Sequence, residues 1–272
     1  MLTLLMKIKV LFEDKNIIVL DKPAGLAVHA DVRTLDEDSV SSFIIENYPT
    51  LKNVGEPMEV EVAGGKKIKI PRPGIVHRLD KETSGVLIVA RNQKTFEFLK
   101  EQFQSHTIKK VYRAFVYGYV PDPKASLATG KRGVINVPIG RSPRDIRMWT
   151  AGRGARLPLR DALTEYVVLE RFSDIENPKT KPDTEHQFSY IEAYPKTGRT
   201  HQIRVHMRYI NHPVVSDPLY RGVKDYSLGM KRLALHAYSI TFRLPSGELK
   251  TVESPFPMDF KKAIKTYLPK VK

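Results

Sequence analysis

Runs of apolar residues along the chain predict a mixture of strands and helices. Leu11–Leu20 and Val86–Ala90 are rich in aliphatic residues, and the second run is short and continuous enough for a fully buried strand. In KTFEFLKEQFQSH, Phe96, Leu99 and Phe103 recur at helical spacing. That spacing predicts an amphipathic helix directly after the buried strand.

Three further runs predict strands in the second half of the chain: Val111–Val120, Glu165–Arg171 and Phe188–Tyr194. The last two flank the polar, proline-containing stretch SDIENPKTKPDTEHQ, so we expect a long hairpin connection between them. Strands and helices in this irregular order favour an α+β fold. They lack the regular alternation of a doubly wound α/β fold.

A short helix is expected over HQIRVHMRYI. Ile203, Met207 and Ile210 fall on one face of that helix, and Thr200 precedes it as a candidate N-cap. Arg204 then lies off the apolar stripe.

Two segments lack an apolar pattern. For the polar stretch 52–73 a plain surface hairpin is favoured over a specificity element. Residues 141–161 carry six arginines around Trp149, the chain's only tryptophan. Arg144 and Arg147 can lie along phosphates while Trp149 stacks on an unpaired base, or the segment is a flexible, solvated hairpin. The sequence leaves both alternatives open.

Composition points to a polyanionic partner. The chain of 272 residues can form one large domain or two closely fused lobes, and its 45 Lys+Arg against 30 Asp+Glu give a formal charge of +15. RNA, DNA and anionic lipid all fit that charge. Lipid is the weakest candidate, because no apolar run approaches the roughly 20 residues of a spanning helix.

The chain contains no cysteine, which excludes disulfides and thiolate metal sites. Its first residues, MLTLLMKIKV, lack the basic leader and cleavage site of a signal peptide. We therefore expect a soluble, cytoplasmic protein that acts as a monomer, without a membrane partner.

The segment GIVHRLDKETSGVLIVARN, residues 74–92, sets one carboxylate among basic and aliphatic residues. If His77–Asp80 is extended, Arg78 and Asp80 project from the same face. The arginine then keeps Asp80 ionised, and partial dehydration makes the carboxylate a better nucleophile. A structural ion pair at a turn is the commoner meaning of such a pattern, and residue chemistry alone favours it.

The same segment resembles the catalytic motif of the RluA-type pseudouridine synthases, in which the Asp of HRLD attacks a uridine in RNA. Four more blocks resemble that family in the same order: VLFEDKNIIVLDKPAGLAVH, IKKVYRAFVYG, TGRTHQIRVHMRYINHPVVSDPLYRG and RLALHAYSITF, at 10–29, 108–118, 197–222 and 232–242. Five ordered blocks are far more specific than one. The resemblance implies a pseudouridine-synthase catalytic fold with a mixed, mainly antiparallel central sheet flanked by helices and loops.

The resemblance also implies a reaction. Uridine becomes pseudouridine when the bond from nitrogen 1 to the sugar breaks, the base turns, carbon 5 joins the sugar and a proton leaves. No metal, redox step or nucleotide cofactor is needed. Asp80 either adds to the ring or helps the uracil depart and then abstracts the sugar proton. The target must first leave its stack, because side chains cannot reach both base and sugar inside a helix.

By the family's pattern, Tyr112 is the active-site tyrosine, whose ring can stack on the uracil and whose phenol can relay the carbon 5 proton. Arg204 is the partner of the catalytic Asp80 and ranks above Arg199 in that role. Arg78 holds the vacated position of the flipped base or nearby phosphates, or only orients the aspartate.

Other residues near the predicted helix have two readings each. Ile203 lines the uracil pocket or simply packs, whereas Arg199 and His201 contact phosphate or stay solvated. His201 and His206 are five apart without an HExxH arrangement, so satisfied or surface histidines are favoured over a zinc site. The chain also lacks a GxSxG elbow and a GxxxxGK[ST] phosphate loop, which argues against an acyl hydrolase or an NTPase.

Two function classes follow. The first is an RNA isomerase, and the second is a non-catalytic RNA-binding protein such as a ribosome assembly factor. Large-subunit ribosomal RNA is the preferred substrate, with transfer RNA as the alternative. The first family block begins near Val10, so we expect no separate RNA-binding domain before the catalytic one and a single catalytic domain over 1–272.

Overall fold

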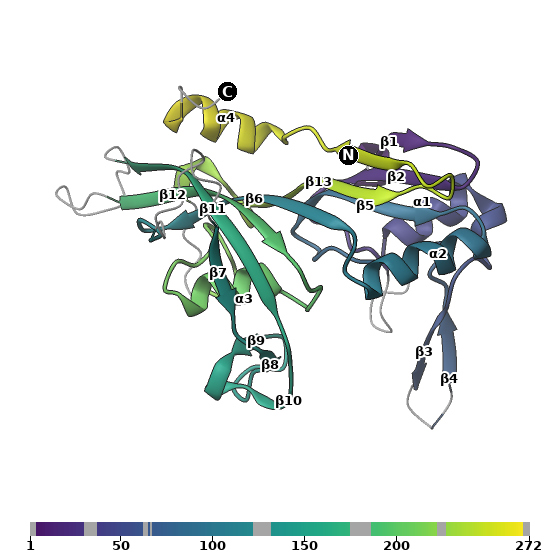
Figure 1. Ribbon diagram of the computed structural model, residues 1–272, viewed down its shortest axis with the longest axis horizontal. Helices are drawn as coiled ribbons and strands as arrows, with labels where there is room; N and C mark the ends of the chain where they lie inside the picture. The colour runs from purple at the N-terminus through teal and green to yellow at the C-terminus, as the bar shows by residue number, and fades with distance from the viewer. Residues whose placement is uncertain are drawn as a thin grey trace. The chain divides into compact units, whose positions relative to one another are not determined.

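The computed structural model describes residues 4–29, 37–61, 65, 67–121, 132–174, 186–221 and 227–268 (Figure 1). By its internal contacts the chain divides into two units, Met1–Lys109 with Ala237–Pro255, and Lys110–His236 with Phe256–Lys272. Strands and helices alternate irregularly in both units, which confirms the expected α+β class. The single catalytic domain over 1–272 stays a prediction.

The first unit is built on a sheet with the strand order β1-β2-β5-β13, and β14 pairs with β13. These strands span Lys9–Glu13, Ile17–Lys22, Ser84–Ala90, Leu235–Arg243 and Leu249–Glu253. Every residue of β5 is buried, which confirms the predicted buried strand. β2 pairs antiparallel with β5, and its apolar residues share the same core.

Helices α1 (Val40–Asn47) and α2 (Gln93–Gln104) belong to the same unit. Helix α2 is the predicted amphipathic helix: the side chain of Asn92 caps it by accepting from Thr95 N, and Phe96 and Leu99 are buried. Single 3₁₀ turns lie at Leu4–Lys7 and Pro49–Leu51.

The run Leu11–Leu20, expected as one strand, is two. Asp14 Oδ1 accepts hydrogen bonds of 2.7 Å from both Asn16 N and Ile17 N, and so turns the chain between β1 and β2. The polar stretch 52–73 contains the expected hairpin, strands β3 (Met58–Glu61) and β4 (Lys67–Ile70), which projects from its unit in Figure 1.

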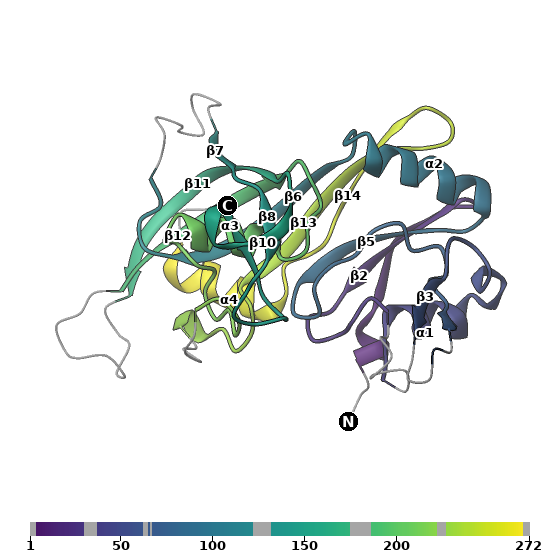
Figure 2. The same ribbon diagram turned by 90° about the horizontal axis from the view of Figure 1, so that it is seen from below.

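The second unit carries the strand order β6-β12-β11-β7, all antiparallel. These strands span Lys109–Tyr117, His186–Pro195, Leu163–Asp174 and Gly133–Asn136. β11 and β12 run side by side as the two longest strands (Figure 1 and Figure 2). The connection between them, predicted from its polar sequence, lies at 175–185, outside the described residues.

Aromatic rings fill the core of the second unit. Phe115 stacks on Tyr190 with ring centroids 4.7 Å apart, and Phe260 of helix α4 (Met258–Tyr267) packs against Phe115 at 5.5 Å. Helix α3 (Gln202–Tyr209) contributes Ile203 and Met207 to the same cluster, which confirms the predicted apolar face. The second unit also contains 3₁₀ turns at Gly152–Gly154 and Ser227–Gly229.

The arginine-rich segment 141–161 is folded, although its sequence shows no periodicity. Strands β8 (Ile139–Arg141), β9 (Trp149–Ala151) and β10 (Arg156–Arg160) form a separate three-stranded sheet in the order β10-β8-β9. We name it the arginine sheet. Strands of three residues are too short to display an alternation, and all five residues of β10 are exposed, so neither leaves an apolar signature.

Candidate functional site

Asp80 lies in the first unit, in the turn before the buried strand β5. Leu79 is 4% exposed and anchors the turn in the core, whereas Arg78 is exposed and Asp80 is half-buried. Thr83 N donates a 3.1 Å hydrogen bond to Asp80 O and closes the turn. His77–Asp80 belongs to no strand, so the expected shared face of Arg78 and Asp80 does not follow from strand alternation.

The side chain of Lys22 is hydrogen-bonded to the backbone of this turn. Its side chain is completely buried, and Nζ donates to the carbonyls of Pro23, Leu26 and Lys81 at 2.9, 2.7 and 3.1 Å. Gly25 N also donates to Lys81 O, at 2.8 Å. The block DKPAG is therefore fastened to the residue that follows Asp80. Sequence reasoning gave Lys22 no role, although a lysine that ends an aliphatic strand was a visible signal.

His77 orients the chain ahead of Asp80. Its Nε2 accepts a 2.9 Å hydrogen bond from Ile88 N on β5, and its ring stacks on Phe103 of α2 with centroids 4.6 Å apart. The acceptor role of Nε2 leaves the ring proton on Nδ1 when the imidazole is neutral. His77 is thus a structural tie between the turn, the strand and the helix.

Gly85, the second residue of β5, has φ 120, and a Cβ there would lie 2.1 Å from Ala237 O of β13. Only glycine permits this close approach of the two backbones.

Arg204 lies in the second unit, buried on α3. Its Nε and Nη2 donate to the two carboxylate oxygens of Asp217 at 2.7 and 2.8 Å. Asp217 also accepts from Leu219 N and Tyr220 N, at 2.9 and 3.1 Å. The guanidinium therefore has a fixed position within its own unit. Sequence reasoning missed Asp217, which lies thirteen residues away along the chain.

The start of α3 differs from the prediction. The N-cap is His201, not Thr200; its backbone is left-handed at φ 56 and its side chain makes no capping hydrogen bond. His201 Nδ1 instead lies 2.8 Å from Tyr220 Oη. Its backbone can adopt this conformation, for which histidine is one of the more tolerant residues.

Helix α3 is buried beyond its apolar stripe, since every residue from Gln202 to Met207 is buried. His206 Nδ1 lies 2.8 Å from Thr164 Oγ1 and Nε2 lies 2.9 Å from Val137 O. Burial lowers the pKa of His206 and favours its neutral form. The expectation of a satisfied histidine is thus confirmed for His206.

Tyr112 is half-buried on β6 and packs against the core of the second unit. Lys110 precedes it by two residues, so both side chains project from one face of the strand. Lys110 Nζ donates to Thr197 O at 3.1 Å, which ties β6 to the segment before α3. Burial lowers the pKa of Lys110 to about 8.

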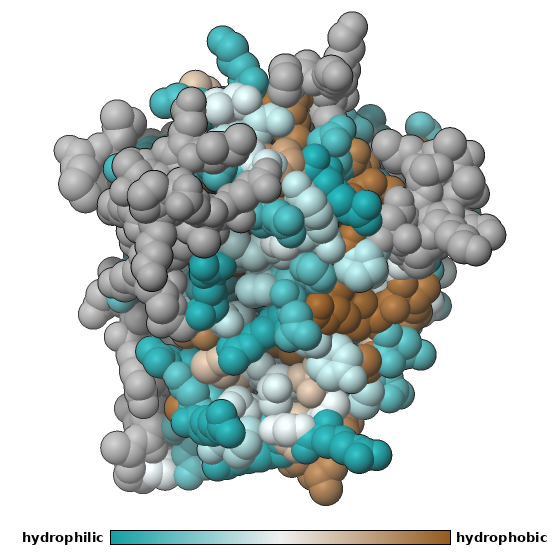
Figure 3. All heavy atoms as spheres, turned by 90° about the vertical axis from the view of Figure 1, so that its left-hand side faces the viewer, coloured by the Kyte–Doolittle hydropathy of each residue, from teal (hydrophilic) through white to brown (hydrophobic). Residues whose placement is uncertain are grey.

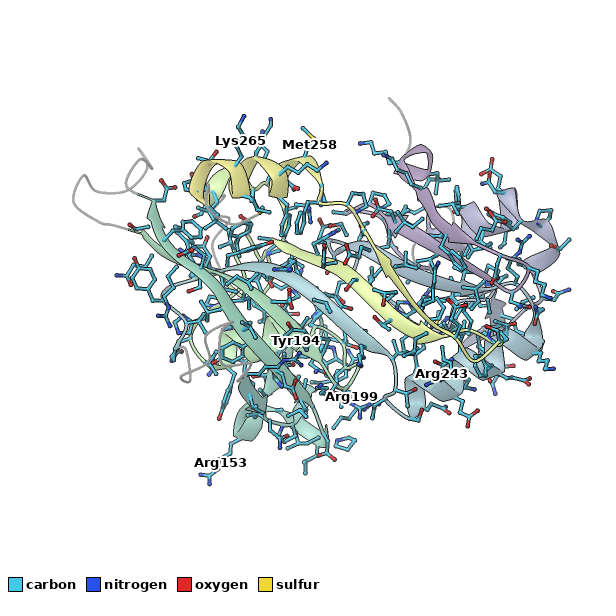
Figure 4. All side chains as sticks on the ribbon, turned by 45° about the horizontal axis from the view of Figure 1, so that its top comes forward. Arg153, Tyr194, Arg199, Arg243, Met258 and Lys265 are labelled. Carbon is cyan, nitrogen blue, oxygen red and sulfur yellow. The ribbon has the colours of Figure 1, made fainter. Side chains whose placement is uncertain are left out.

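Two more residues predicted for the site are Ile203 and Arg199. Ile203, 4% exposed, packs in the core. Arg199, labelled in Figure 4, is partly exposed, and its Nε donates to Asp161 O at 2.9 Å.

The loop between β8 and β9 of the arginine sheet presents Arg144 and Arg147 to solvent. Arg147 pairs with Asp145 through Nε and Nη2, and these hydrogen bonds lower the pKa of Asp145 to about 2. Trp149 is half-buried and lies under the Arg141 guanidinium at 5.0 Å. Arg153 points away from the rest of its unit in Figure 4. Polar side chains also cover much of the described surface on the side nearest β11 and β12 (Figure 3).

Within the described ranges, no group of three or more His, Asp or Glu side chains could hold a metal ion. Among those same residues, no helix has the length and apolar character needed to cross a membrane.

Known proteins resemble this chain over most of its length. The family model described as RNA pseudouridylate synthase matches residues 16–209. The ribosomal large subunit pseudouridine synthase D of Neisseria meningitidis serogroup B is 36% identical over 266 residues, 93% of this chain and 59% of the relative. The chain thus spans less than two thirds of that relative's length. An uncharacterized RNA pseudouridine synthase of Bacillus subtilis, YlyB, is 34% identical over 260 residues, covering 95% of this chain and 72% of the relative.

Solved structures agree with the fold. Human RNA Pseudouridylate Synthase Domain Containing 4 superposes with a TM-score of 0.62 at 25% identity, over 96% of this chain and 93% of that one. Human RNA Pseudouridylate Synthase Domain Containing 1 gives 0.63 at 22% identity, over 93% and 85%, a likeness that concerns the fold. The resemblance to RluA-type enzymes is confirmed, and the chain belongs to the RNA pseudouridylate synthase family.

Proposed function

We propose that this protein isomerises specific uridines to pseudouridine in structured RNA, with Asp80 as the nucleophile. The observation that carries the proposal is a half-buried carboxylate at the motif position HRLD, in a chain that belongs to this family. Large-subunit ribosomal RNA is the proposed substrate, because the relatives of Neisseria meningitidis and Borreliella burgdorferi are named ribosomal large subunit pseudouridine synthase D. Transfer RNA is the alternative.

A fixed backbone around Asp80 supports its role. Lys22 and Gly25 both donate to Lys81 O, and His77 fastens the residues just before Asp80. A nucleophile held in this way loses little freedom when the substrate arrives, which is how orientation lowers a barrier. Asp80 either adds to the uracil ring or assists its departure and takes the sugar proton.

We assign Arg204 as the basic partner of the Asp80 carboxylate. A guanidinium carries five N–H donors in a rigid fork, and Asp217 occupies the Nε and Nη2 side. Since Asp217 balances the charge of Arg204, the arginine acts on Asp80 chiefly as an oriented donor.

Tyr112 is the proposed aromatic platform for the flipped uracil. Stacking of a base on an aromatic side chain is worth about 1–3 kcal/mol, which helps to offset the cost of unstacking. Its hydroxyl is the proposed relay for the proton that leaves carbon 5.

The exposed arginines Arg78, Arg144 and Arg147, with Arg199 and His201, are the proposed contacts to phosphate. Arg78 adjoins the catalytic turn and is assigned to the position that the flipped base leaves. Ile203 is assigned to the wall behind the uracil. We place the reaction in the cytoplasm and assign it to a monomer, without a nucleotide cofactor.

The second candidate function is RNA binding without catalysis, as in a ribosome assembly factor. The net charge of +15 fits both functions. Asp80 separates them, because a carboxylate in a phosphate-binding region repels the ligand and gives a pure binder no advantage.

The test is Asp80→Asn, with pseudouridine measured in a large-subunit ribosomal RNA transcript and RNA affinity measured in parallel. We expect no product and a nearly unchanged Kd. Glu82→Gln, which removes a half-buried acid two residues away in the same turn, is the matched control and should stay active. Full activity of Asp80→Asn would end the catalytic assignment.

A further inference from the structure

Tyr220 meets three separate parts of the second unit, although it belongs to none of the regular elements. The residue is 3% exposed. Its hydroxyl accepts a 2.9 Å hydrogen bond from Trp149 N on strand β9 of the arginine sheet. The same hydroxyl lies 2.8 Å from Nδ1 of His201, the residue that begins α3. A single oxygen thus joins the arginine sheet to the helix start.

The ring of Tyr220 lies beside two arginines of α3. The Arg204 guanidinium carbon lies 4.9 Å from the ring centroid, and that of Arg208 lies at 5.9 Å. Both distances fall within the range of cation–π attraction, which is stronger for a desolvated cation such as the buried Arg204. Tyr220 N also donates to Asp217, the carboxylate that holds Arg204. The ring therefore packs against the Arg204 guanidinium and restricts its position.

We propose that Tyr220 is a positioning residue. Its ring orients the Arg204 guanidinium, and its hydroxyl fixes the arginine sheet on α3. This inference rests on the proposed function, in which Arg204 orients the catalytic carboxylate and the arginine sheet grips RNA. RNA bound by the arginine sheet is then held at a fixed position relative to α3, the helix that carries Arg204. Tyr220 contacts neither RNA nor the reacting atoms in this proposal.

Tyrosine suits this role because a phenol hydroxyl can accept a hydrogen bond and donate one at the same time. The Trp149 amide donates to this hydroxyl, and His201 Nδ1 lies within hydrogen-bond distance of it. Phenylalanine keeps the ring beside Arg204 but leaves the Trp149 amide without this acceptor. Leucine removes the ring as well. The two substitutions therefore separate the hydroxyl's effect from the ring's.

The experiment measures single-turnover pseudouridine formation at saturating ribosomal RNA transcript, together with the Kd of the same RNA. For Tyr220→Phe we expect a Kd about fivefold weaker, with a saturating rate close to that of the wild type. For Tyr220→Leu we expect the saturating rate itself to fall by about 10- to 100-fold. Tyr209→Leu, which removes a 51% exposed tyrosine from α3, is the control and should change neither quantity.

Thermal unfolding of each variant reports the folded fraction, and rates are compared per folded molecule. If Tyr220 had only a structural role, the rate of each variant would fall only in proportion to its folded fraction. Tyr220→Phe would then show no separate effect on Kd. A saturating rate for folded Tyr220→Leu equal to wild type overturns the role of the ring. If the leucine variant does not fold, an unchanged Kd in Tyr220→Phe overturns the coupling.

The outcome is separable from failure of the proposed function. If the wild type forms no pseudouridine, the isomerase assignment fails. If the wild type is active, Asp80→Asn is inactive and both Tyr220 variants behave as wild type, only the positioning role of Tyr220 is wrong.

Discussion

Arg204 and Asp217 form a two-point ion pair, with Nε to Oδ2 at 2.7 Å and Nη2 to Oδ1 at 2.8 Å, and their side chains are 4% and 0% exposed. Water cannot screen such a pair, and two backbone amides complete the coordination of the carboxylate. The predicted catalytic arginine is therefore held by an aspartate in its own unit. Its direction is set before any substrate binds.

Asp217→Asn should destabilise the protein strongly, because it leaves the buried Arg204 charge without its counter-ion. We expect the free energy of unfolding to fall by about 3–5 kcal/mol. Urea or guanidinium unfolding of the two proteins measures it. Asp145→Asn breaks an equally well-formed but exposed arginine pair and should cause no measurable loss. Equal stability of Asp217→Asn and wild type would contradict the buried pair's importance.

Reversing charge on the arginine sheet should weaken RNA binding in a salt-dependent way. For Arg144→Glu with Arg147→Glu we expect the slope of log Kd against log salt concentration to fall by roughly 2, since two phosphate contacts are lost. Arg144 should contribute the larger part, because Arg147 already pairs with Asp145. Fluorescence anisotropy over a salt series gives the slope.

The control for that experiment is Lys261→Glu with Lys265→Glu, which makes the same change in net charge on exposed positions of α4. Its slope should stay closer to that of the wild type. An unchanged slope in the arginine variant would show that the sheet does not contact phosphate.

The buried His206 should make stability depend on pH. Burial lowers its folded-state pKa below the ordinary 6.5, so the unfolded chain binds a proton more readily than the folded one. The stability that neutral His206 contributes is fully present above pH 6.5. It is lost as the pH falls through 6.5 toward the folded-state pKa. The loss is at most about 1.4 kcal/mol for each pH unit.

Urea unfolding between pH of about 8 and about 5.5 measures this dependence. His206→Gln should show a flatter profile below pH 6.5 than the wild type. His106→Asn, at an exposed histidine whose positive φ asparagine tolerates, should keep the wild-type slope. Identical slopes for wild type and His206→Gln would mean that another group is responsible.

Local pattern was sufficient for several elements. The continuous apolar run predicted β5, and the three- and four-residue spacings predicted α2 and the apolar face of α3, since burial on one side leaves a periodic trace in the sequence. The apolar pattern did not predict structure that polar residues set through the backbone. Asp14 turned an apolar run into two strands, and a left-handed His201 displaced the expected cap at Thr200.

The sequence by itself determined the family, the candidate nucleophile Asp80 and the basic character of the surface, because motif spelling and charge are properties of the chain read in order. Only the tertiary structure decided the partners: Asp217 for Arg204, Lys81 O for Lys22, and the Tyr220 hydroxyl for Trp149 and His201. A hydrogen bond needs two groups within about 3 Å in the right direction. Which groups from separate segments meet at that distance depends on how the strands and helices pack, and periodicity along one segment carries no record of it.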